Sequence, residues 1–294
     1  MRYLSLFSGI EAATVAWEPL GWEPVAFAEI DPWCCRLLRK RYPSVPNLGD
    51  VRTIDWKEFK REYGEVDLLV GGSPCQSFSL AGRREGMAGE SGALVEYVRA
   101  VQEVCPQYLV WENVKGALSA ENGEAFGWFI RALDDLGYCV AWRVLDASMF
   151  GVPQHRERLF VVATLGDPRA TEVLFDTAGL RDNYAQSTEQ YDAAFARLGG
   201  ENSRVCCIAS DNGKSTVFIE RCPTMTVAGD APRIITKNVA RRMTPLECER
   251  VMGLPDGYTA VIGSDNRRYK IIGNTMAVPV MRWIGERIDG TRRA

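Results

Sequence analysis

Short apolar runs alternate with helix-like stretches through the first half of the chain. Residues 3–7, 24–28, 66–70 and 108–111 are apolar, short and bounded by turn formers, a pattern typical of buried strands in a parallel sheet. Between these runs, apolar side chains recur at the spacing of a helix over residues 10–20, 32–42, 94–104 and 124–136. This alternation predicts a doubly wound α/β sheet.

The pattern changes in the second half of the chain. Residues 138–145 and 158–163 are two further predicted strands that can pair with each other. From about residue 166, Gly, Asn, Asp and Thr become frequent and clear periodicity is lost. We therefore predict a large domain made of residues 1–166 and 267–294, and a smaller, irregular domain over residues 167–266.

Two more helices are predicted near the C-terminus. Thr244 and Glu247 have the spacing of a capping box, which predicts a helix that ends at Gly253. Residues 275–288 have the pattern of an amphipathic helix, introduced by a turn at residues 273–274.

The composition is that of a globular enzyme, with 46% hydrophobic and 25% charged residues. No apolar run reaches the roughly 18 residues of a membrane-spanning helix, and the first residues resemble a strand more than a signal peptide. The nine cysteines include no Cys-x-x-Cys pair, which argues against a zinc ribbon or dithiol redox site and indicates a reducing, cytoplasmic location. Because His155 is the single histidine, no multi-histidine metal site is possible and no metal is expected.

The net charge of −3 gives no general affinity for nucleic acid. Binding depends on a local basic surface, however, and not on the average charge. The stretch from Arg233 to Arg242 includes Lys237 and Arg241 and no acidic residue, so it is a candidate for such a surface. An ordinary solvated face is the alternative interpretation.

A cysteine follows the predicted strand at residues 66–70. Residues 71–79 read Gly-Gly-Ser-Pro-Cys-Gln-Ser-Phe-Ser, and the two glycines allow the backbone to turn sharply before Cys75. Open α/β sheets bind ligands at the carboxyl ends of their strands, where this thiol is expected. A structural cysteine buried beside a tight turn is the alternative.

Other strand ends also carry candidate residues. The first predicted strand runs into a small-residue turn, Phe-Ser-Gly-Ile-Glu-Ala at residues 7–12, that opens a helix. Glu29 ends the second strand, where a carboxylate suits ribose hydroxyls, and Asp50 follows the next unit, where it could meet an adenine amino group. Each feature alone is compatible with an ordinary loop, but their order indicates an adenosine-containing cofactor.

Charged groups are expected to converge on Cys75. Glu112 ends the strand that should neighbour the cysteine strand. Gln154, Arg156 and Arg158 alternate before and into the last predicted strand, so they should share one face. A thiol, a carboxyl and two guanidinium groups at one sheet edge indicate a catalytic site, whereas a surface charge cluster is the alternative.

The chain resembles the cytosine-5 DNA methyltransferases of bacteria and phages, which depend on S-adenosylmethionine. The motifs appear in the family's order over nearly the whole chain, except roughly residues 167–235. They are Phe7-Ser8-Gly9, Glu29, Asp50, Pro74-Cys75-Gln76, Glu112-Asn113-Val114, Gln154-x-Arg156-x-Arg158 and Gly273-Asn274-Thr275. The resemblance implies a Rossmann-like mixed sheet of the methyltransferase type, with residues 167–266 as target-recognition domain and hinge.

The resemblance also implies a reaction. Cys75 would add to C6 of a flipped-out cytosine in a specific duplex DNA sequence, and C5 would then take the methyl group of S-adenosylmethionine. Glu112 would hydrogen-bond or protonate N3. Arg158 would hold the base O2, and Arg156 a neighbouring phosphate or carboxylate network; either arginine should lower the pKa of the Cys75 thiol.

Two further sets of residues follow from the resemblance. The expected cofactor-binding residues are Phe7, Ser8, Gly9, Ile10, Glu29, Ile30, Asp50, Val51, Pro74, Leu94, Asn274 and Thr275. The expected DNA-binding residues are Gln76, Ser79, Arg83, Arg84, Gln154, Thr224, Met225 and Thr226. The glycine-rich stretch from Gln76 to Ser91 is expected to close on DNA.

One residue departs from the family pattern. The family often has glycine where this chain has Glu11. A carboxylate facing the carboxylate of the cofactor would repel it, so we expect Glu11 to point to solvent at a helix start.

Three alternatives remain at this stage. They are a tRNA cytosine-5 methyltransferase, an inactive DNA- or cofactor-binding protein, and a hydrolase using Cys75 and His155. The expected partner is double-stranded DNA, and a cognate restriction endonuclease is possible. The resemblance implies a monomer in a bacterial cell, encoded by the bacterium or by a phage or prophage.

Overall fold

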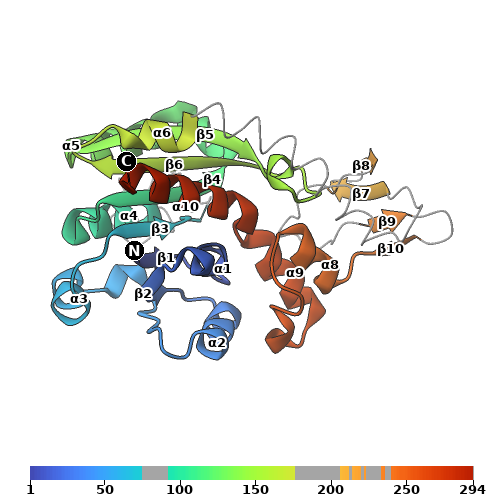
Figure 1. Cartoon of the computed structure of the whole chain (residues 1–294). Coiled ribbons are helices and arrows are strands. Elements are labelled where there is room, and N and C mark those ends of the chain that lie inside the picture. Colours follow the sequence, from blue (N-terminus) through green and yellow to red (C-terminus); the bar gives the residue numbers. More distant parts are fainter. Residues whose placement is uncertain are drawn as a thin grey trace.

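The core of the molecule is a six-stranded mixed sheet in the order β2-β1-β3-β4-β6-β5 (Figure 1). The computed structural model describes residues 1–74, 92–175, 206–211, 214–219, 222, 233–235 and 240–293. The strands of this sheet are β1 (Arg2–Leu6), β2 (Glu23–Ala28), β3 (Leu68–Gly71), β4 (Tyr108–Val114), β5 (Tyr138–Asp146) and β6 (Glu157–Leu165). The first four are parallel, and β6 is antiparallel to both of its neighbours.

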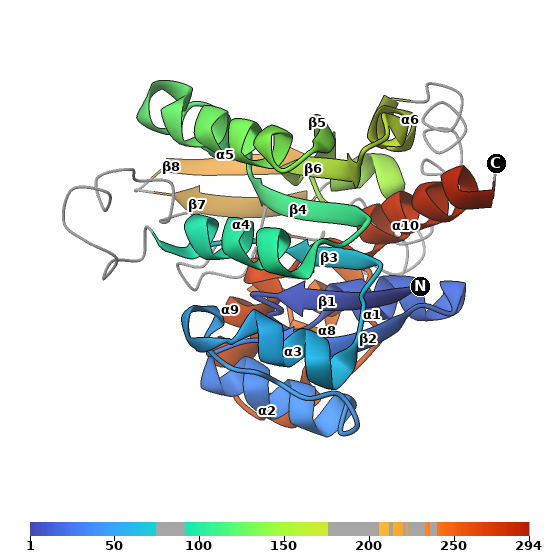
Figure 2. The ribbon, with the colours of Figure 1, turned by 90° about the vertical axis from the view of Figure 1, so that its left-hand side faces the viewer.

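Helices cover both faces of this sheet, as in a doubly wound fold (Figure 2). On one face lie α3 (Trp56–Tyr63), α4 (Gly92–Val104) and α5 (Glu124–Asp135). The other face is covered by α1 (Ala12–Trp17), α6 (Arg169–Phe175) and α10 (Val278–Arg293), and α2 (Pro32–Arg41), α8 (Pro245–Val251) and α9 (Asp265–Asn274) lie beside it. None of the described helices is long and apolar enough to cross a membrane.

The sheet divides the hydrophobic core into two clusters because successive strand side chains point to opposite faces. In β1, Tyr3 packs with the α1 and α10 side, whereas Leu4 packs with the α3, α4 and α5 side. The same alternation separates Val70 from Leu69 in β3. Strands that are apolar on both faces become continuous apolar runs in the sequence, which is why the sequence pattern identified them.

The predicted α/β order is confirmed, with three differences. Helix α3, which begins after the N-cap Asp55, is not among the helices that the sequence pattern predicts. Residues 273–274 form the end of α9 and not a separate turn. β4 extends to Val114 because the antiparallel strand β6 pairs with it beyond the end of β3, so Glu112 lies within the strand and not after it.

A second, four-stranded antiparallel sheet lies beyond α6, in the order β10-β9-β7-β8. Its strands are β7 (Cys206–Asp211), β8 (Lys214–Ile219), β9 (Arg233–Ile235) and β10 (Ala240–Arg242). This part is more regular than predicted, because strands of three to six residues are too short to give a clear period in the sequence. The domain boundary before residue 167 stays a prediction; the first helix after it, α6, packs against β5 and α10.

Candidate functional site

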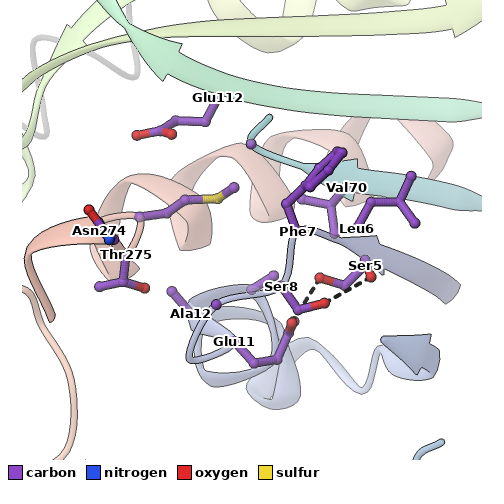
Figure 3. A pocket seen from close by; sticks show the side chains of 14 residues that line it. Ser5, Leu6, Phe7, Ser8, Glu11, Ala12, Val70, Glu112, Asn274 and Thr275 are labelled. Carbon is purple, nitrogen blue, oxygen red and sulfur yellow. Dashed lines mark hydrogen bonds between the residues drawn. The ribbon is translucent and has the colours of Figure 1, made fainter. Parts of the chain in front are cut away.

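A cavity of about 40 Å³ lies at the carboxyl ends of β1 and β3 (Figure 3). Four separate segments of the chain form its walls. The lining residues are Ser5, Leu6, Phe7, Ser8, Gly9, Glu11, Ala12, Ala13, Val70, Gly72, Glu112, Asn274, Thr275 and Met276. The structure therefore brings together Phe7, Ser8 and Gly9 with Glu112 and residues 274–275.

The turn after β1 has a strained backbone. Phe7, Gly9 and Glu11 all have positive φ angles, of 51°, 57° and 63°. Glycine adopts this conformation readily, whereas side chains such as those of Phe7 and Glu11 disfavour it. Ser8 fixes the turn, because its hydroxyl donates to the carbonyl of Ser5 and accepts from the amide of Ala28 in β2.

Glu29 holds the same turn from the end of β2. Its Oε2 accepts a 2.7 Å hydrogen bond from the amide of Gly9, and its Oε1 accepts from the amides of Ile30 and Asp31. Burial raises the pKa of Glu29, although these three backbone hydrogen bonds oppose the shift. A carboxylate has about four acceptor positions, so one position is left for a ligand hydroxyl.

The expectation that Glu11 points to solvent is wrong. Its side chain is 1% exposed and lines the cavity. Oε2 accepts from the hydroxyl of Ser5 at 2.8 Å, and Oε1 accepts from the amide and the hydroxyl of Thr14 at 3.2 and 3.1 Å. These polar partners hold the carboxylate inside the fold. Since one of them is the backbone amide of Thr14, the side chain of Glu11 also caps the N-terminus of α1.

A buried carboxyl and a guanidinium group meet on the opposite wall of the cavity. Glu112 in β4 is 9% exposed, and its Oε1 lies 3.3 Å from Nε of Arg158 in β6. Burial raises the pKa of Glu112 although Arg158 and Arg156 oppose the shift. Gly72 leaves room for this carboxyl, because a Cβ there would lie 3.2 Å from Oε2 of Glu112.

Strand β4 also fixes the segment that leads to Cys75. Nδ2 of Asn113 donates to the carbonyl of Ser73 at 2.8 Å, and Nε1 of Trp111 donates to the Ser73 hydroxyl at 3.3 Å. Ser73 is buried and Pro74 is exposed. Cys75 itself lies outside the described residues, and these contacts hold the backbone two residues before it.

Arg156 does not occupy the place predicted for it. Its side chain is 2% exposed, and its guanidinium group donates to the carbonyls of Gly273 and Thr275. It therefore ties β6 to the end of α9 and cannot contact a phosphate in this structure. The segment that it holds carries Asn274 and Thr275, which line the cavity.

Seven predicted cofactor-binding residues do not line the cavity, among them Glu29, which holds the turn beside it. Leu94 and Val51 are buried in the core on the α4 side, whereas Ile30 is 64% exposed. Pro74 is exposed, and Asp50 caps a short helix and forms a 2.5 Å ion pair with Arg52, which lowers the pKa of that carboxyl. Ile10 is also buried in the core, next to the cavity-lining turn.

The predicted DNA-binding residues remain largely undescribed. Gln76, Ser79, Arg83, Arg84, Thr224, Met225 and Thr226 lie outside the described residues. Gln154 is fully buried, so it is not available to DNA in this structure. Its neighbour His155 is exposed and contacts Asp146, which agrees with the predicted alternation.

Some residues of this region have a positioning role that the sequence alone does not indicate. Ser5 and Thr14 hold the carboxylate of Glu11, but each lies in a strand or helix where the sequence pattern does not distinguish it from an ordinary polar residue. The basic stretch from Arg233 to Arg242 also has an acidic partner that the sequence alone does not indicate. Arg241 makes two 2.7 Å hydrogen bonds to Glu247 at the start of α8, so part of that charge is neutralised within the fold.

The chain is similar in sequence to known proteins. A family model described as C-5 cytosine-specific DNA methylase matches residues 1–192 and 176–290. The chain is 31% identical to the DNA N-6-adenine-methyltransferase of Escherichia phage P1, over 97% of this chain and 61% of that protein. It is 27% identical to the type II methyltransferase M.DsaV of Dactylococcopsis salina, over 98% of this chain and 86% of that protein. The chain thus spans less than two thirds of the phage P1 protein.

Solved structures share the fold. A DNA modification methyltransferase encoded within a prophage of E. coli superposes with a TM-score of 0.71, at 18% identity over the whole of both chains. The Dnmt2 methyltransferase of S. pombe superposes with a TM-score of 0.67, at 18% identity over 99% of both chains. At such identities the likeness concerns the fold alone, and it confirms the predicted Rossmann-like methyltransferase architecture.

Proposed function

Because this chain belongs to the C-5 cytosine-specific DNA methylases, we propose that it transfers the methyl group of S-adenosylmethionine to C5 of a cytosine in duplex DNA. The observation that carries the proposal is the position of Glu112. Its buried carboxyl packs against Gly72, three residues before Cys75, and pairs with Arg158. A carboxyl with a raised pKa is thereby held at the edge of the sheet from which the chain leads to Cys75.

The cavity-lining groups suit S-adenosylmethionine. The ligand carries hydroxyls and positive charge, and the groups around the turn after β1 are carboxylates, hydroxyls and an amide. At Gly9 a Cβ would meet no atom within 4 Å, so there is open space beside the turn. We propose that Phe7 packs on the adenine, Glu29 binds the ribose, and Asn274 and Thr275 hold the methionine end. Ile30, Asp50, Val51, Pro74 and Leu94 would then lie around the adenine.

The first chemical step would activate the base. Cytosine C5 is a poor nucleophile while the ring is aromatic. When the Cys75 thiolate adds to C6, an S–C6 bond forms and the C5–C6 π electrons move to C5. Glu112 would hydrogen-bond N3 and offset the negative charge that develops on the ring. Its raised pKa favours the protonated form that can donate this hydrogen bond.

The next steps would complete the transfer. S-adenosylmethionine, when bound, would supply an electrophilic methyl group: as the bond from C5 to the methyl carbon forms, the sulfur–methyl bond would break and leave S-adenosylhomocysteine. The C5 proton then passes to a base, the S–C6 bond breaks, and the ring regains its aromaticity as Cys75 is released. We propose that Arg158 contacts the base O2 while it holds Glu112, and that Arg156 acts by positioning residues 273–275.

The base must leave the duplex, because C6 is out of reach inside the helix. We propose that Gln76, Ser79, Arg83 and Arg84 contact the DNA around the flipped base. Recognition would involve residues 167–266, with Thr224, Met225 and Thr226 contributing to it.

The name of the phage P1 relative provides a second candidate, methylation of adenine at N6. That name describes a protein of which this chain covers 61%, so the named activity can reside in the part that is not matched. The match to the C-5 cytosine-specific family covers nearly all of this chain and favours cytosine.

The test is a methylation assay with duplex DNA of mixed sequence, transfer RNA and isotopically labelled S-adenosylmethionine. Nucleoside digests analysed by mass spectrometry should show 5-methylcytosine in DNA. N6-methyladenine, or label confined to transfer RNA, would contradict the proposal. Bisulfite sequencing of the product would then give the recognised sequence.

The covalent step is tested separately. Cys75→Ala should abolish transfer and retain binding of DNA and S-adenosylhomocysteine. DNA that contains 5-fluorocytosine should trap an adduct with the wild-type protein and not with the variant. Cys139→Ala removes an exposed thiol on β5 and serves as the matched control. Turnover by Cys75→Ala would exclude the proposed nucleophile.

A further inference from the structure

Glu11 is a buried titratable group that the proposed reaction does not use. Its carboxylate and Glu112 lie on opposite walls of the cavity in the view of Figure 3, and Asn274 and Thr275 line the space between them. The cavity volume of about 40 Å³ accommodates a few waters or one small polar group. This is the size of a ligand's terminal group and not of a whole nucleoside.

The Glu11 carboxylate has no ion-pair partner among the described residues. Ser5 and Thr14 supply three hydrogen bonds, all from neutral donors. A buried carboxylate without a cation is costly, and its pKa is raised to about 7 by burial. One of its roughly four acceptor positions remains, so the site can accept one more donor.

The backbone of Glu11 adds an independent observation. Its φ of 63° and ψ of 58° lie in the left-handed region, which costs a residue with a side chain about 1 kcal/mol or more. Glycine would avoid that cost and would also avoid burying a charge. Strain and burial at one residue that lines a cavity are typical of a functional position.

We propose that the Glu11 carboxylate binds the α-ammonium group of the methionine moiety of S-adenosylmethionine. This inference rests on the proposed function. The ammonium group supplies the cation that the buried carboxylate lacks, and it fits the small volume between Glu11 and Asn274. The carboxylate of the same moiety then lies towards the side-chain amide of Asn274, away from Glu11. Repulsion between the two carboxylates, which an inward Glu11 would otherwise cause, is thereby avoided.

The test measures binding and not turnover. Isothermal titration gives the Kd of S-adenosylhomocysteine, which has the ammonium group but no sulfonium charge, and of its analogue that lacks the α-amino group. In the wild-type protein the ammonium group should improve affinity by about tenfold or more. Glu11→Gln should lose most of this preference while its affinity for the deaminated analogue stays within about threefold. Glu18→Gln, an exposed position after α1, should behave as wild type.

The outcomes separate this inference from the proposed function. If the wild-type protein binds neither compound, the proposed function fails. If it binds S-adenosylhomocysteine and Glu11→Gln keeps the full preference for the ammonium group, the role of Glu11 is excluded. If Glu11→Gln weakens the binding of S-adenosylmethionine but not of S-adenosylhomocysteine, the carboxylate contacts the sulfonium and not the ammonium group, and the proposal is wrong.

A measurement on the wild-type protein covers the case in which Glu11→Gln does not fold. The preference for the ammonium group should grow as the pH rises from 6 to 8 and Glu11 ionises. The other titratable groups near Glu11 are Tyr3, Tyr42, Tyr258 and Glu29, with Glu112 on the opposite wall of the cavity. The pKa of each tyrosine is raised, so the tyrosines stay neutral in this range, and burial also raises the pKa of Glu29 and of Glu112. A wild-type preference that is absent at every pH would overturn the proposal.

Discussion

Nε of Arg158 lies 3.3 Å from Oε1 of Glu112, across the antiparallel pair of β6 and β4. Both side chains are largely buried, and the same carboxyl group packs against Gly72. Glu112 therefore has a fixed position but a weakened tendency to ionise, because burial outweighs the effect of the two nearby arginines on its pKa. The raised pKa favours the protonated carboxyl, which is the form that can donate a hydrogen bond to a base nitrogen.

Replacement of this carboxyl should affect the chemical step more than binding. Glu112→Gln should lower kcat by about 10²- to 10⁴-fold, because an amide can hydrogen-bond N3 but cannot transfer a proton to it. Kd values for DNA and S-adenosylhomocysteine should stay within a few-fold of wild type. Single-turnover kinetics and binding titrations measure the two effects, with the exposed Glu124→Gln as control. A variant with kcat within threefold of wild type would exclude Glu112 as the acid.

Arg156 should act through the backbone that it holds. Arg156→Lys keeps the charge but cannot reach the carbonyls of Gly273 and Thr275 with the same fork of donors. We expect it to reduce the free energy of unfolding by about 2 kcal/mol, and to weaken S-adenosylhomocysteine binding several-fold because residues 274–275 line the cavity. Urea titration and calorimetry measure the two quantities. Arg61→Lys, on the exposed side of α3, should change neither.

The stability of the ligand-free protein should depend on pH through Glu11. The pKa of Glu11 is raised from 4.5 to about 7, so between these values the folded state binds more protons than the unfolded state and its stability falls as the pH rises. For such a shift the loss is about 3 kcal/mol. The difference in unfolding free energy between wild type and Glu11→Gln should shift by this amount, in favour of the variant, from pH 4 to pH 8. Taking this difference cancels the contribution of Glu29, because both proteins contain it. A difference in unfolding free energy that does not change with pH would show that the pKa of Glu11 is not raised.

Glu249 should anchor the segment between α8 and α9. It is fully buried and accepts from the amides of Gly257 and Thr259 and from Nη2 of Arg268 at 2.7, 2.7 and 3.0 Å. Glu249→Gln replaces one acceptor oxygen with a donor that faces these groups, so we expect a loss of about 2–4 kcal/mol in unfolding free energy. Thermal and urea unfolding measure it. The exposed Glu286→Gln on α10 should stay within about 0.5 kcal/mol of wild type.

The sequence by itself determined the fold class and the family. Buried strands and amphipathic helices each have a local period, so β1, β3 and β4 and the helices α1, α2 and α4 could be recognised without tertiary contacts. The ordered motifs from Phe7 to Thr275 gave a resemblance that the family match confirms. The convergence of Glu112 with Arg158 also followed from the sequence, since it needs only neighbouring strands and the alternation of side chains.

Tertiary structure decided what the buried polar groups do. A glutamate at a helix start is ordinarily solvated, and only the packing of Ser5 and Thr14 around Glu11 shows that this one is enclosed. Arg156 has the sequence position of a substrate ligand, yet backbone carbonyls at the end of α9 accept the hydrogen bonds of its guanidinium group. In both cases the outcome depends on segments distant in the sequence or on a side-chain direction, and neither leaves a periodic signal in the chain.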